Sequence, residues 1–404
     1  MQPTLANTHI LLIIPETTGT IASVSYNLYK GLLAETEGKV YVVSLAAPSP
    51  YGFPFKNLFS IGEATGLKRL FYRRRELSRL KRRLHIDISI STLLGASYWN
   101  VLSDIGDFKI GLFHTTLKQQ KFTSHLLYYA HLILHYLCLR SLDRLVAVNQ
   151  SALLDLQHLF GSRRDIRLAY NIHDIALIRQ RAQEPLESEE EFTIFSHKVI
   201  LYVGHIFPIK GPHRLIEAYA RMKDRENTCL VLLGEDSAQM QKSLSEKAVR
   251  LGIREQVFFL GHKDNPYKYM QRAAMLVSPS LDEGLPGVLI EALSLGLKCV
   301  ATNSSRAIWE IMECAEAYQP NLHEIYVTRY GIISPNKLSD EHFTIRCLTH
   351  AMEICYDKDY LDMELFDVER FTSKTVIPQF LGDYTPTYHR EGQTSPSPSN
   401  PEKL

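Results

Sequence analysis

Short apolar runs alternate with helical patterns along most of this chain, and this alternation restricts the folds available to it. The first cycle has an apolar run at His9–Pro15, a Thr-Gly-Thr turn, a helical pattern at Val24, Leu28 and Leu32, and a second apolar run at Val40–Leu45. Parallel strands need a crossover connection, usually a helix, so the order of strand, turn, helix and strand is typical of a parallel α/β sheet. The chain is therefore predicted to be α/β.

The alternation continues in two blocks that an acidic, proline-containing stretch separates. In the first block, further strands are predicted at Ile86–Ser91, Lys109–His114 and Leu145–Asn149. Periodicity stops in RAQEPLESEEE, between Arg181 and Glu191. The second block begins at Val199 and has strands near Leu201–Gly204, Cys229–Gly234, Val257–Leu260, Met275–Ser278 and Lys298–Ala301. Each block predicts one doubly wound, Rossmann-like domain.

The predicted organisation is two domains, a connection and a tail. A chain of 404 residues exceeds the usual domain size of about 150 residues, which favours two large domains. Two open sheets that face one another form a cleft at the carboxyl ends of their strands, where ligands bind. The tail is rich in Pro and Ser and is predicted to be disordered. The boundaries are a first domain at 1–183, a linker at 184–198, a second domain at 199–365, a C-terminal region at 366–384 and the tail at 385–404.

Composition excludes several classes of function. The formal net charge is +1 and charged residues make up 22%, so no global field favours nucleic acid as a partner. The six cysteines include no CxxC pair, which favours reduced thiols over a disulfide framework or a zinc site. The start lacks a basic stretch before an apolar run, and no segment has 18 uninterrupted apolar residues, so we expect a cytoplasmic protein.

The motif DEGLPGVLIEAL, at Asp282–Leu293, is the most informative for function. Its Gly-Leu-Pro-Gly turn allows several backbone N–H groups to point at one spot, and the following helix adds its positive end, so the motif predicts a diphosphate site. Glu283 precedes the turn, and Glu291 lies about two helical turns beyond it. Their carboxylates can therefore reach hydroxyls on either side of the diphosphate, and a sugar and a ribose are the natural candidates.

The residues around this motif resemble a known family. The Glu-x7-Glu spacing after a strand ending LVSPS is similar to the signature of retaining GT-B glycosyltransferases of family 4, the group 1 glycosyltransferases of bacterial surface polysaccharide synthesis. The loop Gly204–Gly211, GHIFPIKG, resembles the family's Gly-Arg-x4-Lys-Gly loop. The resemblance covers roughly residues 10–380, and several ordered motifs are more specific than one. Four further segments resemble strand ends of the family: 143–149, 170–174, 231–235 and 257–261.

The resemblance implies a fold and a reaction. Two Rossmann-like domains would face a cleft, with the donor on the second domain and the acceptor on the first, and the last helix, Phe371–Leu381, would cross back onto the first domain. A hexose or N-acetylhexosamine would move from a nucleoside diphosphate, with UDP expected, to a lipid-linked, lipopolysaccharide, O-antigen or capsule acceptor. The leaving phosphate oxygen would help to deprotonate the acceptor, so the family needs no metal, cofactor or covalent nucleophile.

The resemblance also implies roles for single residues. Lys210 would be the fixed cation at the diphosphate, where negative charge grows as the sugar–phosphate bond breaks; a solvated loop lysine is the bland alternative. Glu283 would contact the transferred sugar and Glu291 the ribose, although either alone could be an ordinary helix carboxylate. His114, which ends the strand KIGLFH, would face the cleft near the sugar, or would be merely structural. The backbone candidates for donor binding are Gly19, Gly204, Gly234, Gly284, Leu285, Pro286, Gly287 and Val288.

Two departures from the family pattern leave alternatives open. His205 stands where the family usually carries arginine, and the charge of a histidine is conditional near neutrality. Either His205 donates one bond to the phosphate, or another cation such as Arg214 replaces it, or the site is weakened. Only Gly19 is present where the family often has two adjacent glycines. A GT-B sugar-nucleotide epimerase or hydrolase, and a degenerate GT-B protein that binds a membrane or partner without turnover, therefore remain alternatives.

Residues 67–84 are predicted to form a basic amphipathic helix. Between Lys68 and Arg83 there are nine basic residues and one acid, and the predicted apolar side comprises Leu67, Leu70, Phe71, Leu77, Leu80 and Leu84. Such a helix either packs on the first sheet with a solvated face or docks on anionic lipid. Docking would place the protein peripherally at the inner face of the plasma membrane, near a lipid-linked acceptor.

Two patterns with the form of metal sites are rejected. Asp357-Lys358-Asp359 has a DxD form but lies in a helical stretch rather than in a loop after a strand. His131 and His135 have helical ligand spacing, but the glutamate of a zinc peptidase motif is absent. No metal site is predicted.

Overall fold

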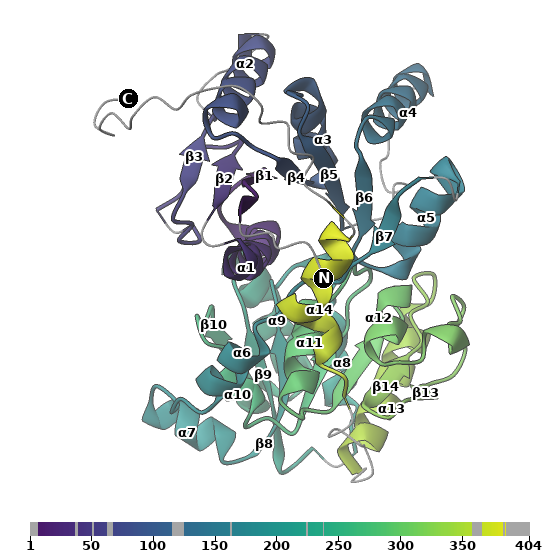
Figure 1. The fold of residues 1–404 in the computed structure, drawn as a ribbon. Coiled ribbons are helices and arrows are strands. Elements are labelled where there is room, and N and C mark those ends of the chain that lie inside the picture. The colour runs from purple at the N-terminus through teal and green to yellow at the C-terminus, as the bar shows by residue number, and fades with distance from the viewer. Residues whose placement is uncertain are drawn as a thin grey trace.

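The computed structural model contains two seven-stranded sheets, and the predicted fold class is confirmed. We call the elements around the first sheet the first domain and those around the second sheet the second domain. Figure 1 shows the first domain, in purple and blue, above the second, in teal and green. The structure describes residues 7–36, 39–50, 52–62, 68–114, 125–161, 164–223, 225–236, 238–357, 366–382 and 384. The predicted tail at 385–404 lies outside these residues.

The first sheet is parallel throughout and has the order β3-β2-β1-β4-β5-β6-β7. The central strands β1 and β4 are buried along their whole length, as parallel strands with helices on both faces must be. The edge strands β3 and β7 were not predicted, because each has three partly exposed residues and no apolar run. The strands are β1 (Ile10–Ile14), β2 (Val40–Ser44), β3 (Leu58–Ser60), β4 (Ile88–Thr92), β5 (Phe108–Phe113), β6 (Arg144–Ala147) and β7 (Ile166–Leu168).

The helices of the first domain are α1 (Gly19–Glu35), α2 (Lys68–Arg83), α3 (Leu93–Leu102), α4 (His125–Arg140) and α5 (Gln150–Phe160). Helix α2 is the predicted basic helix, but its faces differ from the prediction. Phe71 was assigned to the apolar side and is 77% exposed, whereas Leu77 and Leu80 are buried. At about 100° per residue, Phe71 lies roughly 120° around the helix from Leu77. Two basic side chains, Arg73 and Lys81, point inward, and Lys81 pairs with Asp107 at 2.8 Å.

The second sheet has the order β10-β9-β8-β11-β12-β14-β13, and only β13 is antiparallel to its neighbour. Its strands are β8 (Lys198–Val203), β9 (Thr228–Leu233), β10 (Val257–Gly261), β11 (Met275–Ser278), β12 (Cys299–Thr302), β13 (Tyr326–Val327) and β14 (Gly331–Ser334). Its α-helices are α8 (Pro212–Ala220), α9 (Ala238–Arg250), α10 (Tyr267–Met270), α11 (Gly287–Ser294), α12 (Arg306–Ile311) and α13 (Glu341–Asp357). Short 3-10 helices span Pro208–Lys210, Arg254–Gln256, Ala315–Ala317 and Glu369–Phe371.

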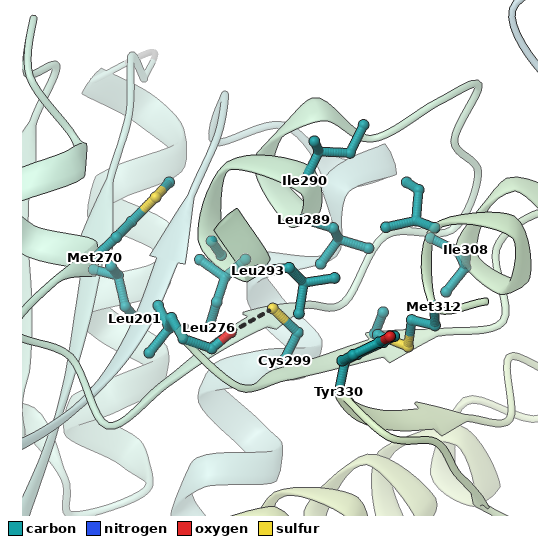
Figure 2. Close-up of a cluster of buried hydrophobic side chains, with 14 of the residues drawn as sticks. Leu201, Met270, Leu276, Leu289, Ile290, Leu293, Cys299, Ile308, Met312 and Tyr330 are labelled. Atoms are coloured by element: carbon teal, nitrogen blue, oxygen red, sulfur yellow. Dashed lines mark hydrogen bonds between the residues drawn. The ribbon is translucent and has the colours of Figure 1, made fainter. Parts of the chain in front are cut away.

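Helix α11 is fixed by the core of the second domain. Leu289, Ile290, Ala292 and Leu293 are buried against strands β8, β11 and β12, and Figure 2 shows this cluster with Leu201, Leu276 and Cys299 beneath the helix. Because these apolar side chains cover most of the circumference of α11, only a narrow stripe with Gly287, Val288 and Glu291 is left partly open. The core therefore determines which residues of α11 can meet a ligand.

The chain crosses between the two domains twice. Helices α6 (Ile175–Ala182) and α7 (Glu189–Phe195) follow the first crossing; α6 packs on α10 and α11, and Ile194 of α7 joins the second core. The range predicted as a linker therefore contains a packed helix and the start of β8. Helix α14 (Ser373–Leu381) follows the second crossing and buries Ile377 and Phe380 in the first core. The predicted return of the last helix to the first domain is confirmed.

Candidate functional site

Lys210 and Glu283, predicted separately from two motifs, meet at the carboxyl end of the second sheet. The Lys210 ammonium lies 2.8 Å from both carboxylate oxygens of Glu283. Ser280 Oγ donates a third hydrogen bond to Glu283 at 2.7 Å. The side chains of Glu283 and Lys210 are 10% and 32% exposed, so the pair is half-sheltered. An ammonium has three N–H donors, and one remains for a ligand.

A close contact between two loops produces this pair. Gly211 follows the 3-10 turn Pro208–Lys210 and has φ +68°, and a Cβ there would lie 2.1 Å from the carbonyl oxygen of Pro279. Only glycine permits both the left-handed backbone and the approach. The N–H of Leu281 donates to the carbonyl of Ile209 at 2.8 Å and holds the loops together. The sequence GHIFPIKG therefore serves to deliver Lys210 to Glu283.

The Gly284–Gly287 turn lies against the first domain. A Cβ on Gly284 would be 2.7 Å from the carbonyl oxygen of His114, and Asn149 Nδ2 donates to the carbonyl of Gly284 at 3.0 Å. Helix α11 starts at Gly287 after Pro286, and no side chain of the described residues caps it. The first N–H groups of a helix have no partner within it, so this end of α11 can bind an anion. The predicted backbone candidates 284–288 are thus placed at a helix terminus between the domains.

His114 lies at the end of β5 and is almost fully buried. Burial lowers the pKa of His114 to about 4, so the imidazole is neutral at neutral pH. Its Nε2 has no hydrogen-bond partner among the described residues. A neutral imidazole with one unsatisfied nitrogen can exchange a hydrogen bond with a ligand.

Glu291 lies on the open stripe of α11, with its side chain 22% exposed. Burial raises the pKa of Glu291 to about 7, although a hydrogen bond with Tyr267 acts in the opposite direction. His173 Nδ1 lies 3.8 Å from Glu291 Oε1. Glu291 is therefore a carboxylate that gives up its proton near neutrality.

His205 and the two strand-end glycines form a second group beside the pair. A Cβ on Gly234 would lie 1.8 Å from the carbonyl oxygen of Gly204, so the strand end at 234 must be glycine. His205 stacks on Phe207 with ring centroids 5.7 Å apart, and its Nδ1 lies 3.9 Å from Glu235 Oε2. The open side chain of His205 leaves it accessible to an anion.

Arg214 does not replace the family arginine. It is buried, and it donates to Glu341 Oε1 at 3.2 Å and to Asn336 Oδ1 at 3.0 Å. Gly19 is the first residue of α1 and has φ +78°, with nothing within 4 Å of the position that a Cβ would occupy. Gly19 is thus open, and no side chain of the described residues fills the space beside it.

Residues 184–317 match the family model described as glycosyl transferases group 1. This segment is a group 1 glycosyl transferase domain. The group 1 glycosyl transferase match predicted from the motifs is therefore confirmed for this segment, which contains Lys210, Glu283 and Glu291.

Named relatives align with less than half of the chain. N-acetylgalactosamine-N,N'-diacetylbacillosaminyl-diphospho-undecaprenol 4-alpha-N-acetylgalactosaminyltransferase of Campylobacter jejuni is 32% identical over 170 residues, which are 42% of this chain and 44% of the relative. The lipopolysaccharide glucosyltransferase WaaG of Escherichia coli (strain K12) is 35% identical over 106 residues, 26% of this chain and 28% of the relative. The chain spans less than half the length of the curated relatives it matches.

Solved structures resemble the whole chain. The crystal structure of Anabaena HepE in complex with UDP and glucose matches 93% of this chain and 96% of its own, with a TM-score of 0.65 and 15% identity. This likeness shows that the two domains are arranged in the GT-B fold.

The described structure also bears on metal sites and on membrane-spanning helices. No group of three His, Cys, Asp or Glu side chains within the described ranges could hold a metal ion. In the two rejected metal-like patterns, residues 358 and 359 lie outside the described structure. The side chains of His131 and Asp357 lie outside it as well. No helix in the described part of the chain is long and apolar enough to cross a membrane.

Four residues beside the glycosyl transferase motifs were not predicted as site residues: Asn149, His173, Tyr267 and Ser280. Asn149 caps α5, and its position after a strand and before a helical pattern is a recognisable cap signal. Ser280 belongs to the LVSPS strand end, next to the motif. Tyr267 and His173 carry no local signal, because only the tertiary fold brings them to Glu291.

Proposed function

We propose that this protein is a retaining glycosyltransferase that moves a hexose or N-acetylhexosamine from a nucleoside diphosphate, with UDP foremost, to a lipopolysaccharide, O-antigen or capsule acceptor. The observation that carries this proposal is the Lys210–Glu283 pair beside the uncapped start of α11. Support also comes from HepE, whose structure contains UDP and glucose, and from relatives named for lipopolysaccharide and diphospho-undecaprenol acceptors.

The geometry suggests how the donor is activated. The leaving diphosphate gains negative charge, and the free N–H of Lys210 and the first N–H groups of α11 are fixed donors for that charge. Because Lys210 and Ser280 occupy Glu283, its carboxylate is better suited to hold sugar hydroxyls than to attack the anomeric carbon. Neutral His114 would hydrogen bond the sugar from the first domain. The acceptor proton would go to the leaving phosphate oxygen, which requires no metal and no covalent nucleophile.

A donor-binding assay followed by a transfer assay tests this function. Thermal unfolding with UDP, GDP, ADP and their sugars, with and without magnesium, should give a metal-independent rise in melting temperature for one nucleotide. Transfer should then need both donor and saccharide acceptor. Turnover with donor alone would indicate an epimerase or hydrolase, and absence of any nucleotide binding would indicate a degenerate binding protein.

We also propose that the first domain docks on an anionic membrane surface and that the protein meets its acceptor there. Helix α2 exposes five arginines beside Phe71, and α4 exposes Ile133, Leu134 and Leu137. Helix α3 packs against both α2 and α4, and Figure 1 shows all three at the end of the first domain that points away from the second. Basic and apolar side chains on one end of a domain suit the cytoplasmic leaflet, where anionic lipids attract arginine. The exposed arginines are Arg74, Arg75, Arg79, Arg82 and Arg83.

Vesicle sedimentation tests this docking. Protein should bind vesicles of phosphatidylglycerol and phosphatidylethanolamine but not phosphatidylcholine, and salt should weaken the binding. The double variant Phe71→Ser, Leu134→Ser should lose it. Val249→Ser is the matched control, because Val249 is 61% exposed on α9 of the second domain. Equal binding to both kinds of vesicle, or equal loss in the control, would contradict the proposal.

A further inference from the structure

His173 lies where the two crossings between the domains touch. Its backbone N–H donates to the carbonyl of Phe371, on the second crossing, at 2.8 Å. The imidazole meets the Phe371 ring edge-on, with centroids 6.4 Å apart and an interplanar angle of 88°. Phe371 is fully buried, so the position of His173 is fixed from behind.

The imidazole of His173 faces helix α11. A Cβ on Gly287 would lie 2.9 Å from His173 Cε1 and 3.4 Å from its Nε2, and Nδ1 is 3.8 Å from Glu291 Oε1. Residues 287 and 291 are four apart and share one face of the helix. One ring therefore covers the face of α11 that carries both the start of the helix and Glu291.

The surroundings select one tautomer of this ring. Burial lowers the pKa of His173 to about 4, so the ring is neutral at pH 7 and donates from only one nitrogen. Nε2 is buried without a partner in the described structure and lies beside Gly287, where α11 has its positive end. A lone pair is favoured there, and the proton is therefore favoured on Nδ1, the nitrogen that faces Glu291.

Glu291 has a second neighbour that can donate a hydrogen bond to it. The Tyr267 hydroxyl of α10 hydrogen bonds to Glu291, and the charges around Tyr267 are Asp174 and Arg181. His173 and Tyr267 are thus the two titratable groups that face the carboxylate. A carboxylate offers about four acceptor sites, so two stay open after both have donated.

We propose that neutral His173, together with Tyr267, positions the Glu291 carboxylate to receive the two hydroxyls of the nucleotide ribose. This inference rests on the function proposed above and adds two positioning residues and a sugar specificity to it. The distance of 3.8 Å is longer than a hydrogen bond, so the bond from Nδ1 forms when Glu291 turns toward the ribose. The two hydroxyls of a ribose then donate to both open acceptor sites of Glu291. A 2′-deoxyribose leaves one of these acceptor sites without a donor.

Ionisation of Glu291 should accompany binding. Hydroxyl groups donate to the charged carboxylate, and burial raises the pKa of Glu291 to about 7. Affinity for the ribose should therefore rise about tenfold between pH 6 and pH 8, as the ionised fraction rises from roughly 0.09 to roughly 0.91. The preference for ribose over 2′-deoxyribose should rise with it, since only the ribose presents both hydroxyls.

Calorimetric titration of two nucleotide sugars tests the proposal. The probes are the diphosphoglucose of uridine, guanosine or adenosine that the wild type binds best, and its 2′-deoxyribose counterpart. His173→Leu should lose about tenfold in affinity for the ribonucleotide at pH 8, with less than a twofold change for the deoxy form. His173→Asn, whose amide nitrogen takes roughly the place of Nδ1, should retain the preference.

Two controls separate the possible failures. Tyr267→Phe removes the other donor to the same carboxylate and should reduce the ribose preference, which keeps the test available if His173→Leu does not fold. Equal ribose preference in the wild type, His173→Leu and Tyr267→Phe at both pH values would overturn the positioning role while leaving the proposed function intact. Failure of the wild type to bind any of the three diphosphoglucoses would instead overturn the proposed function itself.

Discussion

The faces that the two domains present to one another differ in how far their functional groups are held in place. On the second domain, Glu283 accepts from Lys210 at 2.8 Å and from Ser280 at 2.7 Å, and the N–H of Leu281 ties the two loops together. On the first domain, His114 Nε2 has no partner among the described residues, and Gly19 borders open space. The face of the second domain, which we call the donor face after the proposed function, is thus interlocked, whereas these groups on the face of the first domain have fewer partners among the described residues.

The difference fits the two tasks. A diphosphate needs donors that are fixed before the reaction, because preorganised groups stabilise developing charge without reorganising. The saccharide acceptor proposed above is larger and more variable, and a face with fewer fixed contacts suits it. The family match, at residues 184–317, includes the interlocked loops of the second domain.

The two faces are joined beside the turn that would hold the donor. Asn149 donates to the carbonyl of Gly284 at 3.0 Å, and the N–H of Gln150 donates to both oxygens of Glu310 at 3.0 Å. Both donors lie at the start of α5, so this helix terminus of the first domain is hydrogen bonded to the turn before α11 and to helix α12 of the second domain. Changes at this junction should affect transfer more than donor binding.

Lys210→Ala should have the largest effect if the donor face is preorganised for the diphosphate. It removes the fixed cation and leaves the carboxylate of Glu283 with Ser280 alone, and kcat/KM for transfer should fall roughly 100- to 1000-fold. Steady-state kinetics with the donor that the thermal-unfolding and transfer assays identify provide the measurement. Lys263→Ala is the control, because Lys263 forms a similar ion pair with Glu191 at 2.8 Å on the same domain and does not contact Glu283. A loss smaller than tenfold for Lys210→Ala would mean that α11 alone stabilises the leaving group.

Glu291→Gln should change how the unfolding free energy depends on pH, and this tests the second-domain side of the comparison. The pKa of Glu291 is raised from 4.5 to about 7 by burial, so the folded state holds the proton more tightly and wild-type stability declines as pH rises from about 4.5 to 7. The amide does not titrate, and the variant should gain up to about 3 kcal/mol in unfolding free energy above pH 7 and nothing near pH 4. Urea unfolding at pH 4.5 and 8 measures this.

His114→Gln should show the opposite dependence on the other face. Burial lowers the pKa of His114 from 6.5 to about 4, so its neutral form stabilises the fold above pH 6.5, and this stability is lost as pH falls toward 4. The variant should therefore gain relative to the wild type only at low pH. A gain at the same end of the pH range for both variants would remove the electrostatic contrast between the faces.

Gly284→Ala tests the junction between the faces. A Cβ there would lie 2.7 Å from the carbonyl oxygen of His114, and overpacking against backbone costs about 1–3 kcal/mol. Transfer should fall roughly tenfold or more, while donor affinity should change less. Gly95→Ala on α3 is the matched control, because nothing lies within 4 Å of its added Cβ. Equal losses in transfer and donor affinity would mean that Gly284 serves only the donor.

The regular part of the fold was predictable and its edges were not. Strands β1, β2 and β11 were predicted within one residue of their ends, because buried parallel strands are continuous apolar runs. The edge strands β3, β7 and β13 were missed, and so was β14, the interior strand beside β13. Strands β3, β7 and β13 have two or three partly or fully exposed residues each, so their sequences lack the signal, and β14 is a buried run of only four residues that begins with Gly331.

In the site, local motifs were predictable and tertiary neighbours were not. Lys210 and Glu283 follow strands whose carboxyl ends share one edge, which brings their motifs together. Tyr267 and His173 reach Glu291 only because α10 and the first crossing pack on α11, and no local pattern encodes that contact. The inward turn of Lys81 has the same origin, since its partner Asp107 lies on another element of the first domain.

His205→Arg should have the smallest effect and bears on the one weak position of the donor face. A guanidinium is always charged and can hold a phosphate through two hydrogen bonds, so donor affinity should rise about threefold. Calorimetric titration of the donor provides the measurement. His197→Arg, exposed at the amino end of β8, should not change the affinity. No gain for His205→Arg would place the diphosphate beyond reach of residue 205, and the donor face would then depend on Lys210 and α11.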